Sequence, residues 1–462
     1  MKRTGLIILL TTLVIVFFSV QAQPADVIFS GEYYAAGMYL ERTSLVKDTA
    51  ADGPSTAFYF QRLRLNTTFI VHPGLFLITR ADIMERSWGA SRAMPGTSTD
   101  MASSGTVAEN ENIAWDLAYI QYISPIGIFR AGYQDDGAWG TVFGDSTVPL
   151  GKVQYIGAVG PVQCIAYFGK FKEGDVTAKA PYTGPLGPNT DRDIDMYTLA
   201  VNYPGKQVQA GLLFKHFRSA LPRSPAYGEF LQNFTVGIPY VKAQMGPVAL
   251  QAELMYGFGK YQKWDDHITA HDDVDLQNFA GWIDATADFG IAYIGGSVAY
   301  IAGDDKGTAN RKEGGVLTGG TDWNPCLIMF NFDRYYWAGT LAGHDGTMNP
   351  NATDNPYLAT NNAGMTNAYF FSLRAGIRPI DKLDIMASVS YARADKTPNG
   401  EWVDRDYGYE VDATANYKIT NNLSYMLGAG YWFVGDYYLG STSVNRSVAD
   451  NFMVINKLTL TF

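Results

Sequence analysis

Beyond Phe18, the sequence lacks any apolar run long enough for a membrane-spanning helix. Such a helix needs about 20 consecutive apolar residues, and the mean hydropathy of the whole chain is only −0.09. The sequence therefore excludes a bundle of spanning helices. A soluble protein and a membrane protein built from strands both remain compatible with this composition.

Cysteine and histidine are also scarce, with two and five residues respectively. Cys164 falls in a predicted strand and Cys326 in a long predicted loop, so we expect two free thiols and no disulfide framework. The histidines stand mostly in loops or at turns, outside any nucleophile motif, and no phosphate loop, dinucleotide fingerprint or haem-attachment motif occurs. We therefore expect neither catalysis nor a cofactor.

Positive charge is in deficit. The chain carries 35 basic and 45 acidic residues, a formal charge of −10, which becomes −12 once Lys2 and Arg3 are removed with a signal peptide. Nothing resembles the basic footprint of a nucleic-acid-binding protein. The acidic residues cluster in predicted loops, which we interpret as a solvated rim.

Aromatic residues and glycine are abundant instead. Aromatic side chains make up 14% of the chain, and there are 48 glycines. Aromatic, glycine-rich sequence of average hydropathy is typical of strands that are apolar on one face only. A soluble chain of 462 residues usually splits into several domains, but a closed barrel uses one sheet for the whole chain.

The apolar residues repeat with a period of two from about residue 26 onward. The clearest example is the segment 58–72, where Leu63 and Leu65 alternate with Arg62 and Arg64. This alternation fits a soluble sandwich as well as a barrel in lipid, because each has one apolar and one polar face per strand.

The spacing of turns separates these two architectures. Short breaks fall at 72–74, 124–127, 160–161, 203–206, 245–247, 289–290, 379–382 and 420–422. Long polar segments alternate with them, at 43–56, 87–111, 137–150, 172–191, 219–229, 262–275, 304–366, 395–405 and 436–449. Short periplasmic turns and long extracellular loops are the asymmetry expected of an outer-membrane barrel.

The turn count predicts an all-β transmembrane antiparallel barrel of eighteen strands. Eight short turns define sixteen strands, and a first strand at 27–42 and a last strand at 450–462 add two. Sixteen is the second choice, because the pair around 151–171 is weakly patterned. An even number is expected for a bacterial barrel.

Both ends of the chain predict export. Residues 1–22 combine Lys2 and Arg3 with an apolar core and end in a small residue, so we expect a signal peptide cleaved after Ala22 and one barrel domain over 23–462. The last strand alternates apolar residues and ends in Phe462, which resembles the signal read by the bacterial barrel-assembly machinery. The predicted location is the outer membrane of a Gram-negative bacterium.

Tyrosine and tryptophan are expected at strand ends, where amphipathic rings lie at the level of the lipid headgroups. The alternative is that tyrosine is simply common in strands. The candidates for these belts are Tyr33 and Tyr34, Tyr119 and Tyr122, Tyr335 to Trp337, Tyr431 and Trp432, and Tyr437 and Tyr438.

Charged residues on the polar faces are the candidates for lining the lumen. An Arg or Lys that faces hydrocarbon at the midplane costs about 2–4 kcal/mol, so these side chains are expected to face water or one another. The candidates are Arg62, Arg64, Arg80, Asp82, Arg86, Asp116, Arg130, Asp136, Glu253, Asp284, Asp288, Arg374, Arg378, Glu410 and Asp412.

Two interpretations of this lining remain open. Rings of charge filter ions and solutes, whereas cross-strand ion pairs merely hold the wall. Since the arginines crowd into the early strands, we expect an Arg-rich wall that favours anionic or carboxylated solutes. Acidic residues of later strands, such as Glu253, Asp284 and Glu410, would face it across the lumen.

The segment 304–366 is far longer than the other loops and contains an apolar, aromatic stretch that must be buried. We expect it to fold into the barrel mouth as a constriction or lid. The alternatives are an outward hairpin or a missed pair of strands. The candidate constriction residues are Phe330, Phe332, Arg334, Tyr335, Tyr336 and Trp337.

One acidic loop has the residue types of a metal site. It places Asp265, Asp266, His267, His271, Asp272 and Asp273 within nine residues. Carboxylate-rich loops bind calcium weakly, but a solvated acidic loop is the simpler interpretation, and we assign no metal to it.

With these features, the chain resembles the outer-membrane porins related to the alginate-export family. The likeness rests on eighteen strands, the Arg-bearing segments 60–66 and 79–82, one very long loop, and the C-terminal pair 407–419 and 423–436. It implies passive passage of a solute through an Arg-lined lumen and does not fix alginate as that solute. The acidic lining candidates depart from a purely electropositive tunnel.

The expected function is a channel for small hydrophilic solutes, anions among them, in contact with outer-membrane lipid and lipopolysaccharide. Two alternatives belong to other classes. The barrel could be a sheath around a partner such as a periplasmic electron carrier, which requires a lumen free of inserted loops. It could also be a surface receptor that acts through its long loops.

Overall fold

The computed structural model describes residues 26–43, 45, 55–89, 113–173, 193–223, 230–265, 271–339, 364–397, 402–440 and 447–462. The expected signal peptide, residues 1–22, lies outside this set.

Eighteen long strands form one antiparallel sheet, which confirms the predicted number. They are β1 (Asp26–Leu40), β2 (Thr56–His72), β3 (Leu75–Ser87), β4 (Ile113–Ser124), β5 (Gly127–Asp136), β6 (Val148–Val159), β7 (Val162–Lys172), β8 (Ile194–Pro204), β9 (Val208–Ser219), β10 (Phe230–Met245), β11 (Val248–Trp264), β12 (Val274–Asp288), β13 (Ala292–Ile301), β15 (Ala368–Ile380), β16 (Leu383–Ala394), β17 (Asp406–Lys418), β18 (Leu423–Val434) and β19 (Asn451–Thr461).

Three short elements complete the described secondary structure. β14 (Arg311–Lys312) lies parallel to the start of β12, and α2 (Phe332–Ala338) and η1 (Asp436–Leu439) are short helices. Among the described residues, no helix is both long and apolar enough to span a bilayer. The described part of the long loop contains no further strand pair.

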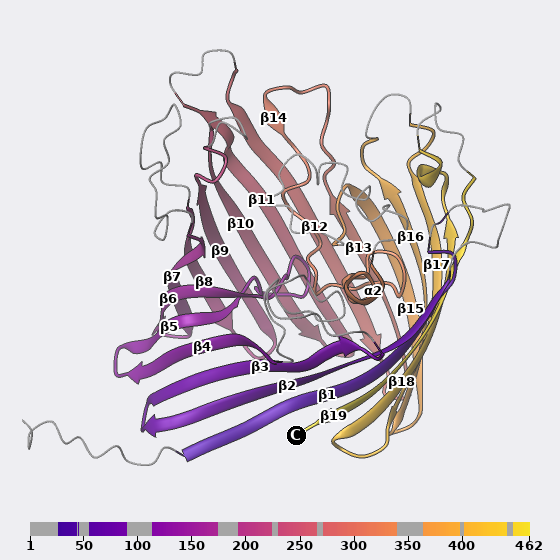
Figure 1. Cartoon of the computed structure of the whole chain (residues 1–462), viewed down its shortest axis with the longest axis horizontal. Coiled ribbons are helices and arrows are strands. Elements are labelled where there is room, and N and C mark those ends of the chain that lie inside the picture. Colours follow the sequence, from indigo (N-terminus) through magenta and orange to yellow (C-terminus); the bar gives the residue numbers. More distant parts are fainter. Residues whose placement is uncertain are drawn as a thin grey trace, which may run out of the picture.

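The sheet closes on itself because the first strand pairs with the last. β1 lies between β2 and β19, and its register on β19 runs from Glu32 opposite Thr461 to Leu40 opposite Met453. Figure 1 shows β1 beside β19, with the other strands completing the ring. Each long strand of the described sheet therefore has two neighbours, as spanning a bilayer requires.

All eight predicted short turns occur where the sequence places them, between consecutive strands from β2–β3 to β17–β18. Gly74 and Gly160 have positive φ angles of 83° and 59° at two of these turns, a conformation that glycine adopts without steric cost. The weakly patterned pair around 151–171 is present as β6 and β7, so the second-choice count of sixteen strands is wrong.

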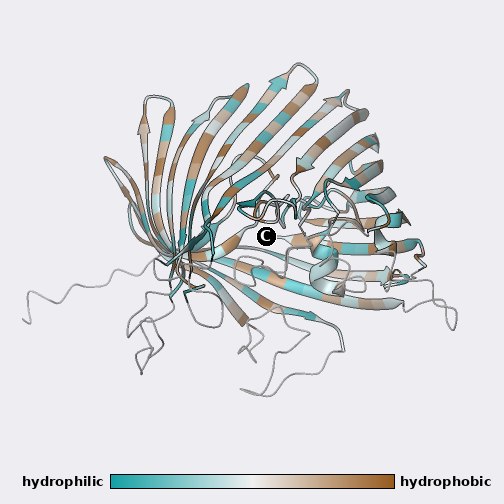
Figure 2. Ribbon diagram, turned by 90° about the horizontal axis from the view of Figure 1, so that it is seen from above, coloured by the Kyte–Doolittle hydropathy of each residue, from teal (hydrophilic) through white to brown (hydrophobic). Residues whose placement is uncertain are grey.

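The two faces of each strand differ in exposure as expected of a barrel in lipid. On β15, Leu373 is 72% exposed and Phe371 46%, whereas the inward-facing Phe370 is fully buried. Figure 2 shows the resulting alternation of apolar and polar bands along the strands. An outer face of exposed leucine, phenylalanine and valine this wide is a surface for hydrocarbon.

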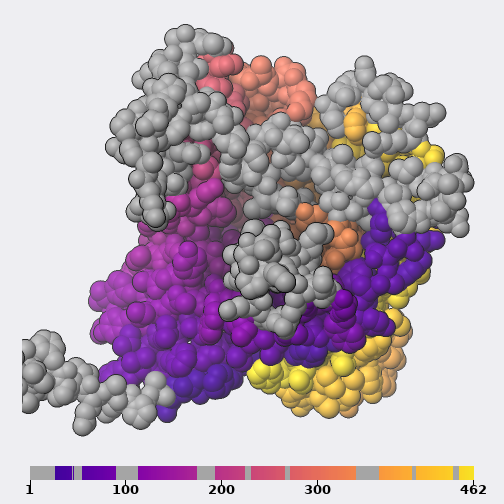
Figure 3. Space-filling view, in the orientation of Figure 1, coloured from indigo at the N-terminus to yellow at the C-terminus, as the bar shows by residue number. Residues whose placement is uncertain are grey.

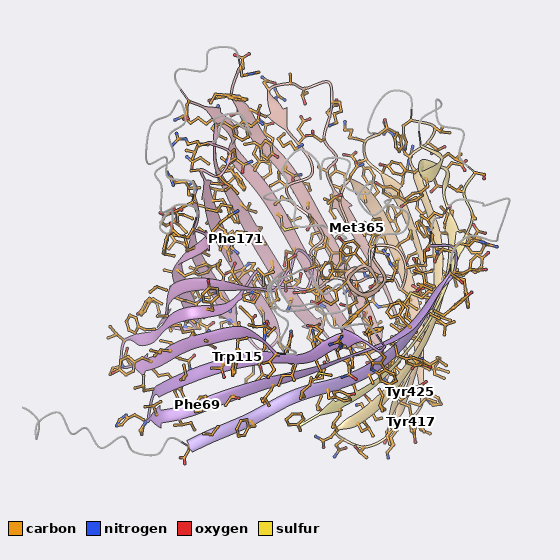
Figure 4. The ribbon with its side chains drawn as sticks, in the orientation of Figure 1. Phe69, Trp115, Phe171, Met365, Tyr417 and Tyr425 are labelled. Carbon is orange, nitrogen blue, oxygen red and sulfur yellow. The ribbon has the colours of Figure 1, made fainter. Side chains whose placement is uncertain are left out.

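Exposed aromatic side chains gather near both ends of the strands. Trp115 lies near the start of β4 and Phe171 near the end of β7, both beside long loops, whereas Tyr417, Tyr425 and the half-buried Phe69 lie near short turns (Figure 4). Rings at these two levels match the headgroup regions of the two leaflets.

Several aromatic residues predicted for these belts lie inside the barrel instead. Tyr122 and Tyr431 are exposed, but Trp432 is fully buried on the inner face. Adjacent residues of a strand point to opposite faces, so both members of such a pair cannot face lipid. The other belt candidates found inside or at the loops are Tyr34, Tyr119, Tyr437, Tyr438 and, in α2, residues 335–337.

The hydrophobic core lies inside the barrel, between the wall and two inward-folded loops. Phe143 comes from loop 137–147, and Ile328, Met329 and Phe330 come from the long loop; all four are essentially inaccessible to solvent. Figure 1 shows α2 inside the ring of strands. In Figure 3, orange atoms of the long loop lie between the magenta and yellow walls.

Candidate functional site

Loop 137–147 connects β5 to β6 and reaches the wall formed by β10–β12. The backbone amide and the Oγ1 of Thr141 donate to the Glu253 carboxylate on β11, at 3.0 and 2.8 Å. Trp139 Nε1 donates to the carbonyl oxygen of Ile238 on β10, at 2.9 Å. The sequence predicted an ordinary outer loop here, and the structure shows a loop folded into the lumen.

An aromatic cluster joins this loop to the long loop. The ring of Phe143 lies 5.9 Å from Trp282 of β12 and 5.1 Å from Trp323 of the long loop, between ring centroids. The Gly144 amide donates to the Gly319 carbonyl at 3.2 Å, and the Thr147 amide donates to Asp322 at 2.8 Å. The two loops therefore form one unit inside the barrel, here called the inner plug (137–147 and 313–339).

Asp145 is a titratable group of the inner plug outside the strands. Its Oδ1 accepts the Trp139 amide at 2.7 Å. Burial, with a smaller contribution from the nearby Asp322, raises the pKa of the Asp145 carboxyl to about 7. The charge of the inner plug therefore changes in the neutral pH range.

Asn278 on β12 fastens the long loop to the wall. Its Nδ2 donates to the Glu313 carbonyl at 2.7 Å, and its Oδ1 accepts the amides of Val316 and Leu317 at 3.1 and 2.6 Å. The side chain is fully buried. One amide side chain thus satisfies three main-chain groups of the loop that have no partner in the sheet.

Glu410 on β17 fastens the same loop further along. Its two carboxylate oxygens accept the amides of Ile328 and Met329, both at 2.6 Å. Phe330 then packs edge-on against Phe370 and Tyr407, at 6.2 and 5.8 Å between ring centroids.

The candidate constriction residues occupy the next turn of the inner plug. Arg334 is 1% exposed, and its guanidinium donates to the carbonyls of Ile328 and Gly339, so it holds its own loop and does not face a solute. The ring of Trp337 stacks 4.3 Å from Phe60 of β2. Tyr336 is 39% exposed. Phe332 and Tyr335 are half-buried beside it.

The wall of β2–β9 carries most of the predicted charged residues. Arg64 forms a two-pronged pair with Asp82, at 2.7 and 2.6 Å, and Arg80 bridges Asp116 at 3.2 Å and Asp135 at 2.7 Å. Arg62 pairs with Glu85 at 3.4 Å, and Arg86 is buried. Arginine and carboxylate therefore alternate along the same wall.

A second charged group lies further round this wall. The Asp136 carboxylate of β5 is shared by Lys152 and Lys215, at 3.2 and 2.7 Å, and accepts the Tyr167 hydroxyl at 2.6 Å. Each lysine binds its own oxygen of the carboxylate, so the group has two cations for one anion.

Arg130 differs from its neighbours on this wall. Its Nε donates to Gln121 at 2.7 Å, and its guanidinium lies 5.9 Å from the Tyr119 ring centroid. Within the described part of the chain, no carboxylate forms an ion pair with it. Arg130, Lys152 and Lys215 line a cavity of about 280 Å³ between the wall and loop 137–147, together with the carboxylates of Asp135, Asp136, Asp145 and Glu253.

The structure contradicts the expectation of opposed basic and acidic walls. Glu253, Glu410 and Asp412 are at most 3% exposed and lie beneath the inner plug, where they accept loop amides. Asp284 lies beside Arg374, at 2.7 and 2.8 Å, and not opposite the early arginines. Side chains of opposite charge that face inward on adjacent or next-but-one strands pair before they can face one another across a wide lumen.

Asp288 and Arg378 lie at the rim, beside the short turn that joins β12 to β13. They pair at 3.0 Å and are both substantially exposed. They therefore stand at the short-turn mouth of the lumen.

The acidic loop does not bring its described members together. Asp265 pairs with Arg223 at 2.6 Å, Asp273 approaches Lys260 at 3.5 Å, and the His271 ring stacks on Trp264. Asp272 is exposed. Asp266 and His267 lie outside the described residues.

Sequence reasoning missed Lys152, Lys215 and Tyr167, although a signal for the lysines was present. Each lysine falls at a position of its strand that alternates with outward-facing apolar residues such as Val153 and Phe214, so its side chain points inward. It also missed the inward course of loop 137–147, for which the sequence offers no comparable signal.

Comparison with known proteins shows similarity in structure only. No protein-family model and no curated protein matches the sequence. Pseudomonas aeruginosa OccK2 (OpdF), solved in complex with glucuronate, is 10% identical with a TM-score of 0.50, covering 94% of this chain and 98% of that one. Pseudomonas aeruginosa OpdQ is 9% identical with a TM-score of 0.50, covering 95% and 97%.

A BenF-like porin from Pseudomonas fluorescens is 10% identical with a TM-score of 0.49, covering 94% of this chain and 99% of that one. Such low identity shows the fold alone. The chain has the closed-barrel fold of bacterial outer-membrane porins.

Proposed function

We propose that this chain is an outer-membrane channel through which small hydrophilic solutes, anions among them, diffuse passively. The inner plug covers the β10–β12 wall and the inner faces of β15 and β17 with apolar packing. The β2–β9 wall keeps its charged side chains, several of them 20–30% exposed. Solute is expected to pass along this wall, in the space that the inner plug leaves.

The observation that carries the anionic part of the proposal is Arg130. Its guanidinium forms no ion pair with a carboxylate among the described residues, and it lines a cavity together with Lys152 and Lys215. The four carboxylates that also line this cavity are each bound to another group. A guanidinium pairs readily with a carboxylate or phosphate of a solute. The complex of the OccK2 neighbour with glucuronate makes a carboxylated sugar the first solute to test.

Single-channel current across a planar bilayer with a salt gradient tests the proposal. We expect steady ohmic conductance from the refolded mature protein. Removal of one charge about 8 Å from the path in a water-filled lumen changes an ion's energy by about 0.5 kcal/mol. The Arg130→Gln variant should therefore lower the anion-to-cation permeability ratio at least about twofold.

The matched control is Lys206→Gln, which removes a cation from the exposed turn between β8 and β9. It should change the ratio much less. No current from a folded barrel would contradict the open channel, and an unchanged reversal potential in Arg130→Gln would contradict the role of Arg130. Swelling of liposomes in glucuronate, compared with glucose, measures preference for the carboxylated sugar directly.

The inner plug argues against a sheath around a protein partner. A threaded partner such as a periplasmic electron carrier needs the lumen that Phe143 and Ile328 to Phe330 fill. Membership among the alginate-export-like barrels stays a prediction, and the paired carboxylates on the β2–β9 wall disfavour a purely electropositive tunnel.

We propose transport without catalysis. Of the described histidines, His72 contacts the Pro73 carbonyl, His216 contacts Thr235 and His271 stacks on Trp264, so none is paired with a serine nucleophile. Hydrolysis of a chromogenic ester by the pure barrel would contradict this.

The outer surface is proposed to contact lipopolysaccharide near Arg393. This side chain is exposed beside Tyr369 and Tyr391 at the long-loop end and has no ion pair among the described residues. Lipid phosphate is its natural partner, and lipid A that copurifies with the barrel would support it. The terminal strand with Phe462 is proposed to bind the assembly machinery, which loss of membrane insertion in Phe462→Ala would test.

A further inference from the structure

Two carboxylates and one thiol converge where the inner plug meets β17. Cys326 of the long loop and Glu410 and Asp412 of β17 each place one sulfur or oxygen atom within 4.8 Å of the others. All three residues are buried, at most 4% exposed. Glu410 and Asp412 share one face of the strand, and the loop brings the thiol to them.

Backbone amides fix the orientation of both carboxylates. Glu410 accepts the amides of Ile328 and Met329, and Asp412 Oδ2 accepts the Leu327 amide at 3.3 Å. Asp412 Oδ1, by contrast, is inaccessible to solvent and has no hydrogen-bond partner among the described residues. A buried carboxylate oxygen without a donor is costly.

The free oxygen lies close to the backbone of Gly430 on β18. A Cβ on Gly430 of β18 would lie 2.6 Å from Asp412 Oδ1 and 3.4 Å from Glu410 Oε1. The same position lies 3.2 Å from Leu327 Cβ, so any side chain at residue 430 would press against the two carboxylates and the long loop.

The cluster has acceptors but no cation. No lysine or arginine of the described chain forms an ion pair with Glu410 or Asp412. Two buried carboxylates side by side repel each other when both are ionised, and an uncompensated buried charge destabilises the fold. A bound cation would satisfy Asp412 Oδ1 and remove this repulsion at once.

We propose that Cys326, Glu410 and Asp412 bind a divalent zinc-like cation that fastens the inner plug to β17. A thiolate with two carboxylates suits Zn²⁺, which accepts sulfur and oxygen ligands in tetrahedral sites. Calcium and magnesium prefer oxygen ligands alone, so the thiol disfavours them. The fourth position is left for water, because the protein supplies three ligands.

This assignment goes beyond transport, because it makes the position of the inner plug depend on metal. Cys326 directly precedes the three residues whose amides bind Asp412 and Glu410. A metal bond at Cys326 therefore anchors the segment that leads into α2.

The test uses the refolded full-length mature barrel with Zn²⁺, and with Co²⁺ as a spectroscopic probe. We expect one metal ion per chain and a thiolate-to-cobalt absorption band. Cys326→Ser should abolish the band, and both Cys326→Ser and Asp412→Asn should weaken Zn²⁺ binding more than about 100-fold, since even outer-shell changes cost 10–100-fold. The matched control is Cys164→Ser, which removes the thiol on β7 and should keep both signals.

A second measurement needs no variant and guards against misfolding. In the unsubstituted barrel, Zn²⁺ should slow alkylation of Cys326, read by mass spectrometry, and leave Cys164 unaffected. Absence of stoichiometric metal, or equal protection of both thiols, would overturn the proposal. The cluster would then be a set of protonated acids that hold the loop through hydrogen bonds alone.

Discussion

Replacement of Asn278 by alanine should release part of the inner plug. The side chain satisfies the Glu313 carbonyl and the amides of Val316 and Leu317, all in a fully buried position. Each orphaned buried group costs about 1–3 kcal/mol. Even the lowest value for each gives about 3 kcal/mol, which lowers the ratio of docked to undocked segment at least about 100-fold.

The assay compares single-channel current and tryptic cleavage in Asn278→Ala and Gln277→Ala. Gln277 is the adjacent residue of β12 and points outward, so it matches Asn278 in chemistry and depth but not in contacts. We expect Asn278→Ala to show larger or noisier conductance and cleavage near Arg311, with Gln277→Ala unchanged. Equal conductance and protease resistance in both variants would refute the reasoning that these hydrogen bonds hold the loop.

Two further predictions concern pH and lipid. Since the pKa of Asp145 is raised from 3.8 to about 7, the protonated form stabilises the docked loop, so this stabilisation should decline as pH rises between those values. Current noise measured from pH 5 to pH 8 should therefore increase in the unsubstituted channel and increase less in Asp145→Asn; identical profiles would contradict this. On the outer face, Leu373→Arg at mid-strand should cost about 2–4 kcal/mol in urea titrations of the folded barrel, whereas Ile380→Arg at the end of the same strand should cost at most about 1 kcal/mol. Equal losses would show that Leu373 does not face the middle of the bilayer.

The barrel was predictable because its signals are local. Apolar and polar residues alternate along each strand, and a turn such as 72–74 is marked by Pro73 and Gly74. Closure then follows from the even number of strands and the need to pair every edge.

The candidate site was predictable only in part. Arg62, Arg64 and Arg80 were assigned to a polar wall from their parity, and they are on it. Their partners were not predictable. A carboxylate on a neighbouring strand and one across the lumen both occupy inward-facing positions, so the alternation along a strand does not distinguish them. The structure resolves this in favour of the neighbours, as in Arg64 with Asp82.

The sequence by itself determined that this chain forms a barrel, how many strands it has and which face of each strand meets lipid, because the period of two and the alternation of short turns with long loops are both properties of contiguous residues. Only the tertiary structure decided what fills the lumen. Loop 137–147 and the long loop turn inward because Glu253, Asn278 and Glu410 on the wall accept hydrogen bonds from them. Those contacts join residues 35 to 112 positions apart in the chain, and no local pattern encodes them.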